Sequence, residues 1–226
     1  TEIVLSLGRL DRIRAVDPAA STMTAEAGVI LDRIHEAADA VDRLFPLTLG
    51  SQGSCTIGGN LSSNAGGTAV LAYGNARDMV LGLEVVLPTG EIVEGLRALR
   101  KDNAGYDLKQ LFLGTEGTLG VITAAVLKLW AKPKAQEVAV AGVATPADAL
   151  AALGLAKTRA GAQLTAFEIM PRRLVEFYLA HQPGSRDPLS TPAPWYLLVE
   201  VSVGTGPAEA RALMEAVLED GLAAGL

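Results

Sequence analysis

Residues 50–67 read GSQGSCTIGGNLSSNAGG, and this glycine-rich stretch guides the interpretation of the rest of the chain. It contains six glycines and the only cysteine, Cys55, and no charged residue occurs between Arg43 and Arg77. Glycine lets a ligand approach the main chain closely, and successive backbone N–H groups in such a loop bind an anion without a lysine. We therefore predict that the stretch packs against a phosphorylated ligand. A glycine-rich turn between packed elements is the alternative.

The composition is typical of a globular protein with one large or two modest domains. Of the 226 residues, 50% are hydrophobic and 19% are charged, so a sizeable core can form. The formal net charge of −6 argues against a nucleic-acid partner, which would favour a basic surface. A single cysteine excludes an internal disulfide and fits a reducing compartment. No apolar run is long enough for a membrane span, and the first residues lack the pattern of a secretory signal.

A second glycine cluster, Gly114–Gly120 (GTEGTLG), leads directly into a predicted strand, Val121–Trp130. Its spacing is neither that of the Rossmann fingerprint nor that of the P-loop. Two glycine loops that each adjoin a strand indicate one extended ligand that is contacted at two places.

The remaining patterns predict a mixture of helices and strands. In the first part we expect strands at Glu2–Leu7 and Thr22–Ala27, a helix at Val29–Leu44, a hairpin of Val80–Leu87 with Glu91–Glu94, and a short helix within Arg100–Phe112. His35 lies on the polar side of its helix, where a solvated pair with Asp39 is the expected arrangement.

Lys132–Lys134 is the predicted domain boundary. Beyond it we expect strands at Glu137–Val143, Leu164–Ile169 and Trp195–Val203, and helices at Pro146–Ala160, Pro171–His181 and Pro207–Gly221. Thr145 and Asp148 form a capping-box pattern at the first of these helices. A ferredoxin-like α/β sandwich needs one more strand, which we expect beyond Leu226, so the domain is predicted to be incomplete.

Catalytic patterns are missing from the sequence. Two isolated histidines and one cysteine exclude a zinc-ligand spacing, and there is no Gly-x-Ser-x-Gly elbow. What remains is a cradle of backbone N–H groups and small side chains, which suits a dinucleotide with a pyrophosphate and a large ring system.

Five ordered segments carry a family resemblance: Pro46–Gly67, Tyr73–Gly74, Val80–Gly90, Arg100–Phe112 and Gly114–Thr123. Together they resemble the FAD-linked oxidase family of the vanillyl-alcohol-oxidase superfamily. The nearest branch is that of the D-2-hydroxyglutarate and D-lactate dehydrogenases, with the glycolate oxidase FAD subunit close by. The resemblance implies an α+β fold, with a PCMH-type FAD-binding domain at residues 1–134 and the start of a ferredoxin-like substrate, or cap, domain at residues 135–226.

The resemblance also implies which residues bind FAD. They are Gly50, Gly53, Ser54, Cys55, Gly58, Gly59, Asn60, Ser63, Asn64, Gly66, Glu116, Gly117, Gly120, Val121 and Ile122. The Gly58–Gly59 pair would let the backbone approach the flavin, and residues 116–122 would wrap the adenine half. Covalent attachment through Cys55 is not expected.

The family's catalytic and metal-binding residues have no counterpart in this chain, so no catalytic or metal residue is assigned here. The pyrophosphate loop is expected before Thr1, and the metal ligands and catalytic base after Leu226. We accordingly expect an internal piece of a longer protein.

By resemblance, the intact enzyme oxidises a D-2-hydroxyacid by hydride transfer to flavin, while a base takes the hydroxyl proton. An alkylglycerone-phosphate-synthase-like transferase and a non-catalytic flavin-binding module are the alternatives. The sequence does not identify the electron acceptor, and a homodimer is compatible with it. The bacterial cytoplasm and the mitochondrial matrix are the expected locations.

Overall fold

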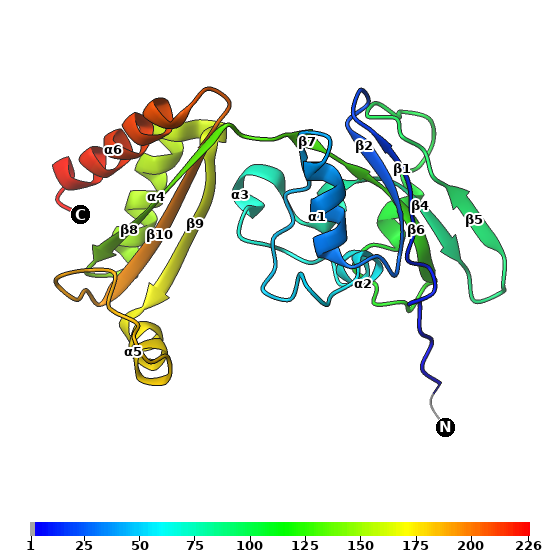
Figure 1. The fold of residues 1–226 in the computed structure, drawn as a ribbon, viewed down its shortest axis with the longest axis horizontal. Helices are drawn as coiled ribbons and strands as arrows, with labels where there is room; N and C mark the ends of the chain where they lie inside the picture. The colour runs from blue at the N-terminus through cyan, green and yellow to red at the C-terminus, as the bar shows by residue number, and fades with distance from the viewer. Residues whose placement is uncertain (1–2) are drawn as a thin grey trace. The chain divides into compact units, whose positions relative to one another are not determined.

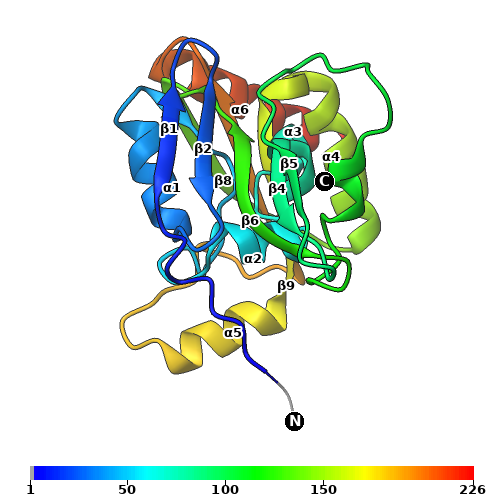
Figure 2. The same cartoon turned by 90° about the vertical axis from the view of Figure 1, so that its right-hand side faces the viewer.

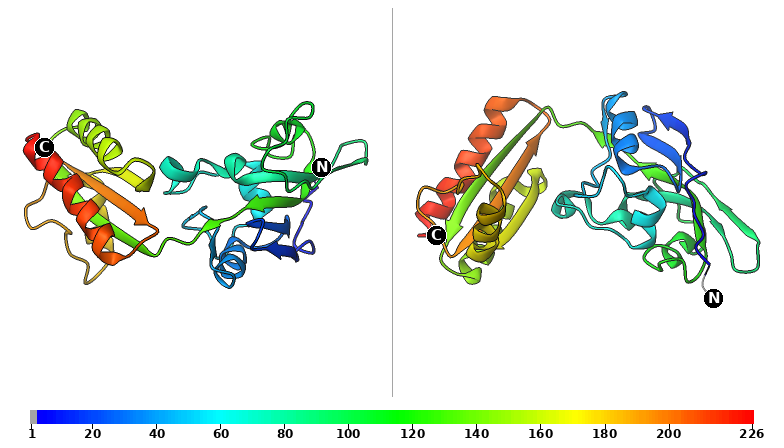
Figure 3. Two further views of the ribbon diagram at one scale, coloured as in Figure 1. Left: turned by 90° about the horizontal axis from the view of Figure 1, so that it is seen from above. Right: turned by 60° about the horizontal axis from the view of Figure 1, so that its bottom comes forward.

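The computed structural model describes residues 3–226, and the chain forms two compact units. The first unit runs to Ala69 and continues from Tyr73 to Lys132, and the second contains Val70–Ala72 and Pro133–Leu226. Each unit combines an antiparallel sheet with helices, as the ribbon views show (Figures 1 and 3). The predicted mixed α+β class is therefore confirmed.

The first unit contains a five-stranded sheet in the order β1-β2-β6-β4-β5 (Figure 2). Its strands are β1 (Ile13–Asp17), β2 (Thr22–Glu26), β4 (Val80–Val86), β5 (Ile92–Gly95) and β6 (Val121–Lys128). A separate two-stranded pair joins β3 (Arg43–Leu44) to β7 (Trp130–Ala131). The predicted hairpin is confirmed as β4–β5, and Gly90 has φ +88° in its turn, a value that favours glycine.

Helices cover one face of this sheet. The helices that contribute to its core are α1 (Leu31–Asp39) and α2 (Ile57–Ser62), and the unit also contains the 3₁₀ turns η1 (Ala76–Met79) and η2 (Leu108–Leu111). The short helix α3 (Val70–Tyr73) is divided between the units, because Val70–Ala72 belong to the second. Side chains from α1 and α2, such as Ile34 and Leu61, share one apolar core with Met23 of β2 and Leu127 of β6. Burial of this core is the main stabilising contribution that the sequence pattern provides.

Two elements differ from the sequence prediction. Residues 3–7 form no strand, although they alternate like one, and the side chains of Ile3 and Val4 are 91% and 94% exposed; Glu2 lies outside the described residues. Because a strand needs a partner for its backbone groups, alternation alone was an insufficient signal. The helix predicted at Val29–Leu44 is shorter, since Asp42 has φ 55° and the chain enters β3 directly afterwards.

The second unit contains a three-stranded antiparallel sheet in the order β8-β10-β9. Its elements are β8 (Ala135–Val143), α4 (Pro146–Ala160), η3 (Gly161–Gln163), β9 (Leu164–Pro171), α5 (Arg172–His181), β10 (Trp195–Val203) and α6 (Pro207–Ala223). Apolar side chains of α4 and α6 pack on one face of the sheet, around Val199 and Val201 (Figure 1).

The local signals of the second unit were accurate. The Thr145 hydroxyl accepts a hydrogen bond from the Asp148 N–H at 3.1 Å, and the Asp148 carboxylate accepts one from the Thr145 N–H at 2.9 Å. The predicted capping box is thus present at the start of α4. The resulting two-layer α/β arrangement agrees with the predicted sandwich.

A buried carboxylate holds the opposite face of the first sheet together. Glu26 is 0% exposed and accepts hydrogen bonds from the Arg12 side chain at 2.9 Å, the Arg12 N–H at 3.0 Å and the Arg14 side chain at 3.1 Å. Arg14 also bonds Glu84 at 3.0 Å, which joins β1 to β4 across the intervening strands. The side-chain hydrogen bond from Arg12 is the main reason that the pKa of Glu26 falls from 4.5 to about 2, against the opposing effect of burial.

We predict that Glu26→Gln lowers the free energy of unfolding of the first unit by about 2 kcal/mol at pH 7, because the two arginines lose a buried, charged acceptor. The pKa of Glu26 is lower in the folded chain than in the unfolded one, so its stabilisation is complete above pH 4.5 and is lost as the pH falls toward about 2. The difference between variant and wild type should therefore shrink over that interval. Urea unfolding followed by Trp130 fluorescence in a Trp195→Phe background measures it.

Glu94→Gln is the matched control, because Glu94 is an exposed carboxylate on the same sheet. It should leave the unfolding curve unchanged at every pH. An equal loss for both variants, or a difference that persists at pH values near 2, would contradict the role of Glu26.

Candidate cofactor-binding site

The two glycine loops meet at one end of the first sheet. The Gly58 N–H donates to the Ala27 carbonyl at 2.8 Å, directly after β2, and the Ala27 N–H donates to the Thr123 carbonyl of β6 at 2.9 Å. The second loop is tied to the end of α2, since the Gly114 N–H donates to the Leu61 carbonyl at 3.1 Å. Sequence reasoning expected two loops on one ligand, and the structure places the loops side by side.

The first loop is also anchored on α1. The N–H groups of Leu31 and Asp32, at the start of this helix, donate to the carbonyls of Cys55 at 3.0 Å and Gln52 at 3.1 Å. These bonds use up carbonyl oxygens of the loop and fix its path. Several N–H groups of the same loop, in contrast, have no acceptor among residues 3–226.

The amides of Gly50, Ser51 and Gly53 donate to no protein acceptor among residues 3–226, and all three residues are exposed. Gly117 in the second loop is also exposed, and its amide has no acceptor within the described chain. No charged side chain comes from residues 44–76. The first loop therefore offers neutral backbone donors that can bind an anion or the polar edge of a ring system. Two carboxylates lie beside these donors: Asp32, whose Oδ2 would be 3.3 Å from a Cβ on Gly53, and the exposed Glu116 of the second loop.

The glycines of the two loops fall into two groups. A Cβ on Gly58 would lie 2.5 Å from the Ala27 Cβ, and one on Gly120 would lie 2.7 Å from the Val85 Cγ1, so both are glycines because the chain packs tightly there. A Cβ on Gly50 or Gly117 would meet nothing within 4 Å, and Gly117 has φ +81°. The contact with Ala27 is a packing reason for glycine at position 58, and the predicted approach of the flavin to Gly58–Gly59 stays a prediction.

Several polar side chains of the predicted site are occupied within the chain. The Asn60 amide donates to the Cys55 Sγ at 3.5 Å, and the Ser63 hydroxyl donates to the Gly59 carbonyl at 3.0 Å. Asn64 Oδ1 accepts the Arg77 N–H at 2.9 Å. These side chains shape the loop, and the main chain presents the free donors.

A short helix, α2, lies inside the stretch that sequence reasoning treated as a loop. It begins at Ile57 after Thr56, whose hydroxyl accepts the Gly59 N–H at 3.4 Å. Its two adjacent glycines disfavour helix formation, so helix propensity did not predict this element. Thr56 was the available signal, because threonine is a favoured N-cap residue.

His35 does not form the predicted pair with Asp39. Its Nε2 lies 2.9 Å from the Leu47 carbonyl, and its Nδ1 lies 3.9 Å from the Asp32 carboxylate. Asp39 pairs with Lys132 instead. His35 therefore fixes the segment that leads into the first glycine loop, since Leu47 lies three residues before Gly50.

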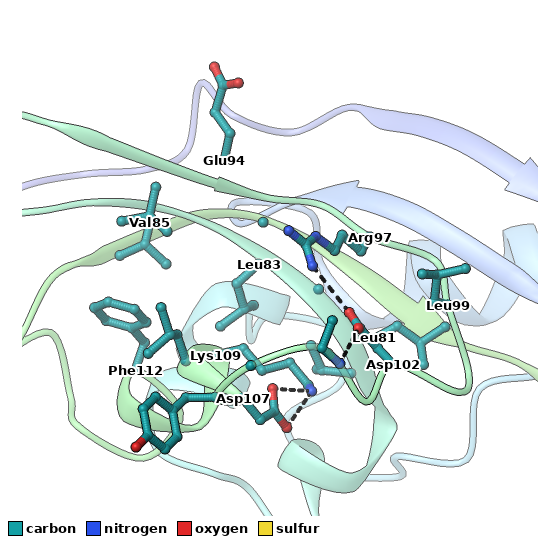
Figure 4. A pocket seen from close by; sticks show the side chains of 18 of the residues that line it. Leu81, Leu83, Val85, Glu94, Arg97, Leu99, Asp102, Asp107, Lys109 and Phe112 are labelled. Carbon is teal, nitrogen blue, oxygen red and sulfur yellow. Dashed lines mark hydrogen bonds and ion pairs between the residues drawn. The ribbon is translucent and has the colours of Figure 1, made fainter.

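A cavity of the first unit lies away from the glycine loops. It has a volume of about 550 Å³ and is bounded by β4, β5 and the segment from Arg97 to Phe112 (Figure 4). None of the fifteen predicted cofactor residues lines it. Four of its charged side chains form two pairs, Arg97 with Asp102 at 3.4 Å and Lys109 with Asp107 at 2.6 Å (Figure 4). Burial, with the nearby Lys109 charge, lowers the pKa of Lys128 in its wall.

Residues 3–226 contain neither a metal-binding cluster nor a membrane-spanning helix. No group of three or more His, Cys, Asp or Glu side chains in this range is placed to hold a metal ion. No helix in the same range is both long and apolar enough to cross a membrane.

Comparison with known families identifies the class of protein as an FAD-binding one. Residues 1–95 match the model of an FAD binding domain, and residues 132–226 match that of the C-terminal domain of FAD linked oxidases. The chain belongs to the FAD-linked oxidase family, and FAD is the cofactor of that family's binding domain.

Curated relatives refine this picture. The chain is 42% identical over 201 residues to a D-2-hydroxyglutarate–pyruvate transhydrogenase of Saccharomyces cerevisiae, covering 89% of this chain and 40% of that protein. It is 39% identical to the mitochondrial D-2-hydroxyglutarate dehydrogenase of Bos taurus, covering 100% of this chain and 41% of that protein. For the D-2-hydroxyglutarate dehydrogenase of Xanthomonas citri the identity is 38%, with 97% and 46% covered. The chain thus spans less than half the length of these relatives.

Among solved structures, an alkyldihydroxyacetonephosphate synthase superposes with a TM-score of 0.76 at 22% identity, covering 95% of this chain and 41% of that chain. At this identity the match shows the fold alone.

We predict opposite effects for two adjacent glycine substitutions in α2. Gly58→Ala should lower the free energy of unfolding by about 1–3 kcal/mol, because the new methyl overpacks against Ala27. Gly59→Ala should be neutral or stabilising by up to about 1 kcal/mol, because alanine favours a helix and its Cβ would meet only the Thr56 Oγ1 at 3.4 Å. Urea unfolding of both variants tests this, and equal effects would contradict the packing explanation.

Proposed function

We propose that this chain forms part of the FAD site of an oxidoreductase that oxidises a D-2-hydroxyacid. One observation carries the proposal: two glycine loops, joined by main-chain hydrogen bonds, present free amides, and the first loop carries no charged side chain. The sequence identity of 38–42% to enzymes of D-2-hydroxyglutarate supports the choice of substrate class.

The residues present fit FAD. The open space beside Gly50 and Gly117 leaves room where a side chain would stand, and the free amides of Gly50, Ser51 and Gly53 offer donors for phosphate or for ring oxygen and nitrogen atoms. The fifteen residues inferred from the family resemblance are our proposed contacts. In this arrangement the main chain supplies most of the polar contacts.

In the proposed reaction FAD, when bound, supplies the hydride acceptor. This chain's residues bind and orient the cofactor, and α1 holds the first loop in place through the carbonyls of Gln52 and Cys55. Because the donors are fixed by the surrounding hydrogen bonds, little reorganisation is needed when the cofactor binds. The base that takes the substrate's hydroxyl proton is not assigned to a residue of this chain.

An ether-forming transferase is the main rival within the same fold. The superposition on alkyldihydroxyacetonephosphate synthase concerns the fold alone, whereas the identity to enzymes of D-2-hydroxyglutarate is higher. The dehydrogenase is therefore the function that we propose.

The purified protein should show flavin absorption, and its flavin band should bleach anaerobically with D-2-hydroxyglutarate or D-lactate but not with the L enantiomers. If the protein binds flavin but no D-2-hydroxyacid reduces it, the proposed dehydrogenase activity is wrong, and a transferase or a non-catalytic flavin-binding module becomes the better interpretation. Failure to bind FAD at all would contradict the proposed site.

Gly50→Ala should weaken FAD binding about tenfold, corresponding to about 1.4 kcal/mol, because the methyl occupies the space beside the free amides. Gly154→Ala is the matched control: a Cβ meets nothing within 4 Å at either position, and Gly154 lies in α4 of the second unit. Fluorescence titration with FAD compares the two variants. Equal affinities would place the cofactor away from the first loop.

A further inference from the structure

Arg77 ends the run of uncharged residues that begins after Arg43, and it lies at the junction of the two glycine loops. Its side chain is partly buried and donates from Nη1 to Gln110 Oε1 at 2.8 Å and from Nη2 to the Leu113 carbonyl at 2.8 Å. Its own N–H donates to Asn64 Oδ1 at 2.9 Å. One residue thus links the segment after α2 to the segment that leads into the second loop.

The backbone around this junction takes conformations that are uncommon for most residues. Asn64 has φ 50° and Glu116 has φ 54°, both in the left-handed region, and Gly114 has φ +81°. Non-glycine residues persist in this region when their surroundings determine the conformation. Asn64 is held by two bonds, from its own N–H to the Leu61 carbonyl at 3.1 Å and from the Arg77 N–H to its Oδ1 at 2.9 Å.

The junction is also tightly packed. A Cβ on Gly114 would lie 3.3 Å from Arg77 Nη2 and 3.3 Å from the Asn64 Cβ, so the guanidinium and the asparagine side chain closely flank this glycine. The adjacent Glu116 N–H reaches the Ser62 carbonyl at 2.9 Å. A displacement of Arg77 would therefore be transmitted to the bonds that join the second loop to α2.

We propose that Arg77 is a positioning residue that sets the spacing of the two glycine loops and so the affinity for FAD; this rests on the proposed function. Its guanidinium acts through Gln110 and Leu113, and its main-chain N–H, which every variant keeps, bonds Asn64. We assign Arg77 no contact with the cofactor. The planar guanidinium donates in two directions at fixed geometry, which a lysine ammonium does not reproduce. The junction therefore depends on the two hydrogen bonds of the guanidinium more than on its positive charge.

Arg43 provides a matched control. Its side chain also bonds only neutral acceptors, the Ser21 hydroxyl at 3.2 Å, the Asp42 carbonyl at 2.9 Å and the Pro18 carbonyl at 2.8 Å. It belongs to the same unit but bonds residues outside both glycine loops. Each Arg43 variant makes the same change of charge as the corresponding Arg77 variant and loses a similar set of hydrogen bonds, but none of these bonds lies at the junction.

The test compares Arg77→Lys and Arg77→Met with Arg43→Lys and Arg43→Met in the whole protein. FAD affinity is measured by fluorescence titration, amide hydrogen exchange at Gly114 and Glu116 by mass spectrometry, and stability by urea unfolding. Both Arg77 variants should bind FAD about tenfold more weakly, a loss of about 1.4 kcal/mol, and should exchange these amides faster. Both Arg43 variants should retain wild-type affinity and exchange, even where their stability falls.

Wild-type FAD affinity in the Arg77 variants would overturn the proposal, as would recovery of affinity in Arg77→Lys, which would assign the effect to charge. If the Arg77 variants fail to fold, Gln110→Ala removes one acceptor and should give the same two changes at smaller size. A wild-type protein that binds no FAD defeats the proposed function. In that case unchanged exchange at Gly114 and Glu116 would separately defeat the role of Arg77.

Discussion

The main-chain hydrogen bonds between the end of α2 and the second glycine loop are the constraint on which the site depends. The carbonyls of Leu61 and Ser62 accept the N–H groups of Gly114 and Glu116, so segments about fifty residues apart in sequence become one surface. Loops held in this way keep their free amides in fixed positions. A ligand that bridges both loops would therefore meet donors that are already arranged.

The site uses neutral groups where many anion sites use lysine or arginine. Two charged side chains of the first unit have structural roles. Glu26 joins Arg12 and Arg14 on one face of the sheet, and Arg77 donates hydrogen bonds at the junction of the two loops. In the cavity beside β4 and β5, Arg97 pairs with Asp102 and Lys109 pairs with Asp107. Backbone amides thus remain as the donors available to a cofactor at the glycine loops.

The sequence predicted elements whose signals are local. Trp195–Val203 coincides with β10, and the Thr145–Asp148 capping box begins α4 as expected, because strand-forming residues and caps act within a few positions. Contacts between distant residues escaped prediction. The packing of Gly58 on Ala27 and the bond from Arg77 to Asn64 depend on how the sheet and helices fold together, and no local pattern reports them.

If the free amides of the two glycine loops hold FAD, amide hydrogen exchange with and without FAD reports it directly. We predict that FAD slows exchange at Gly50, Ser51, Gly53 and Gly117, with little change between Arg97 and Lys109 beside the cavity. Protection confined to the cavity segment, with the loop amides unchanged, would contradict it.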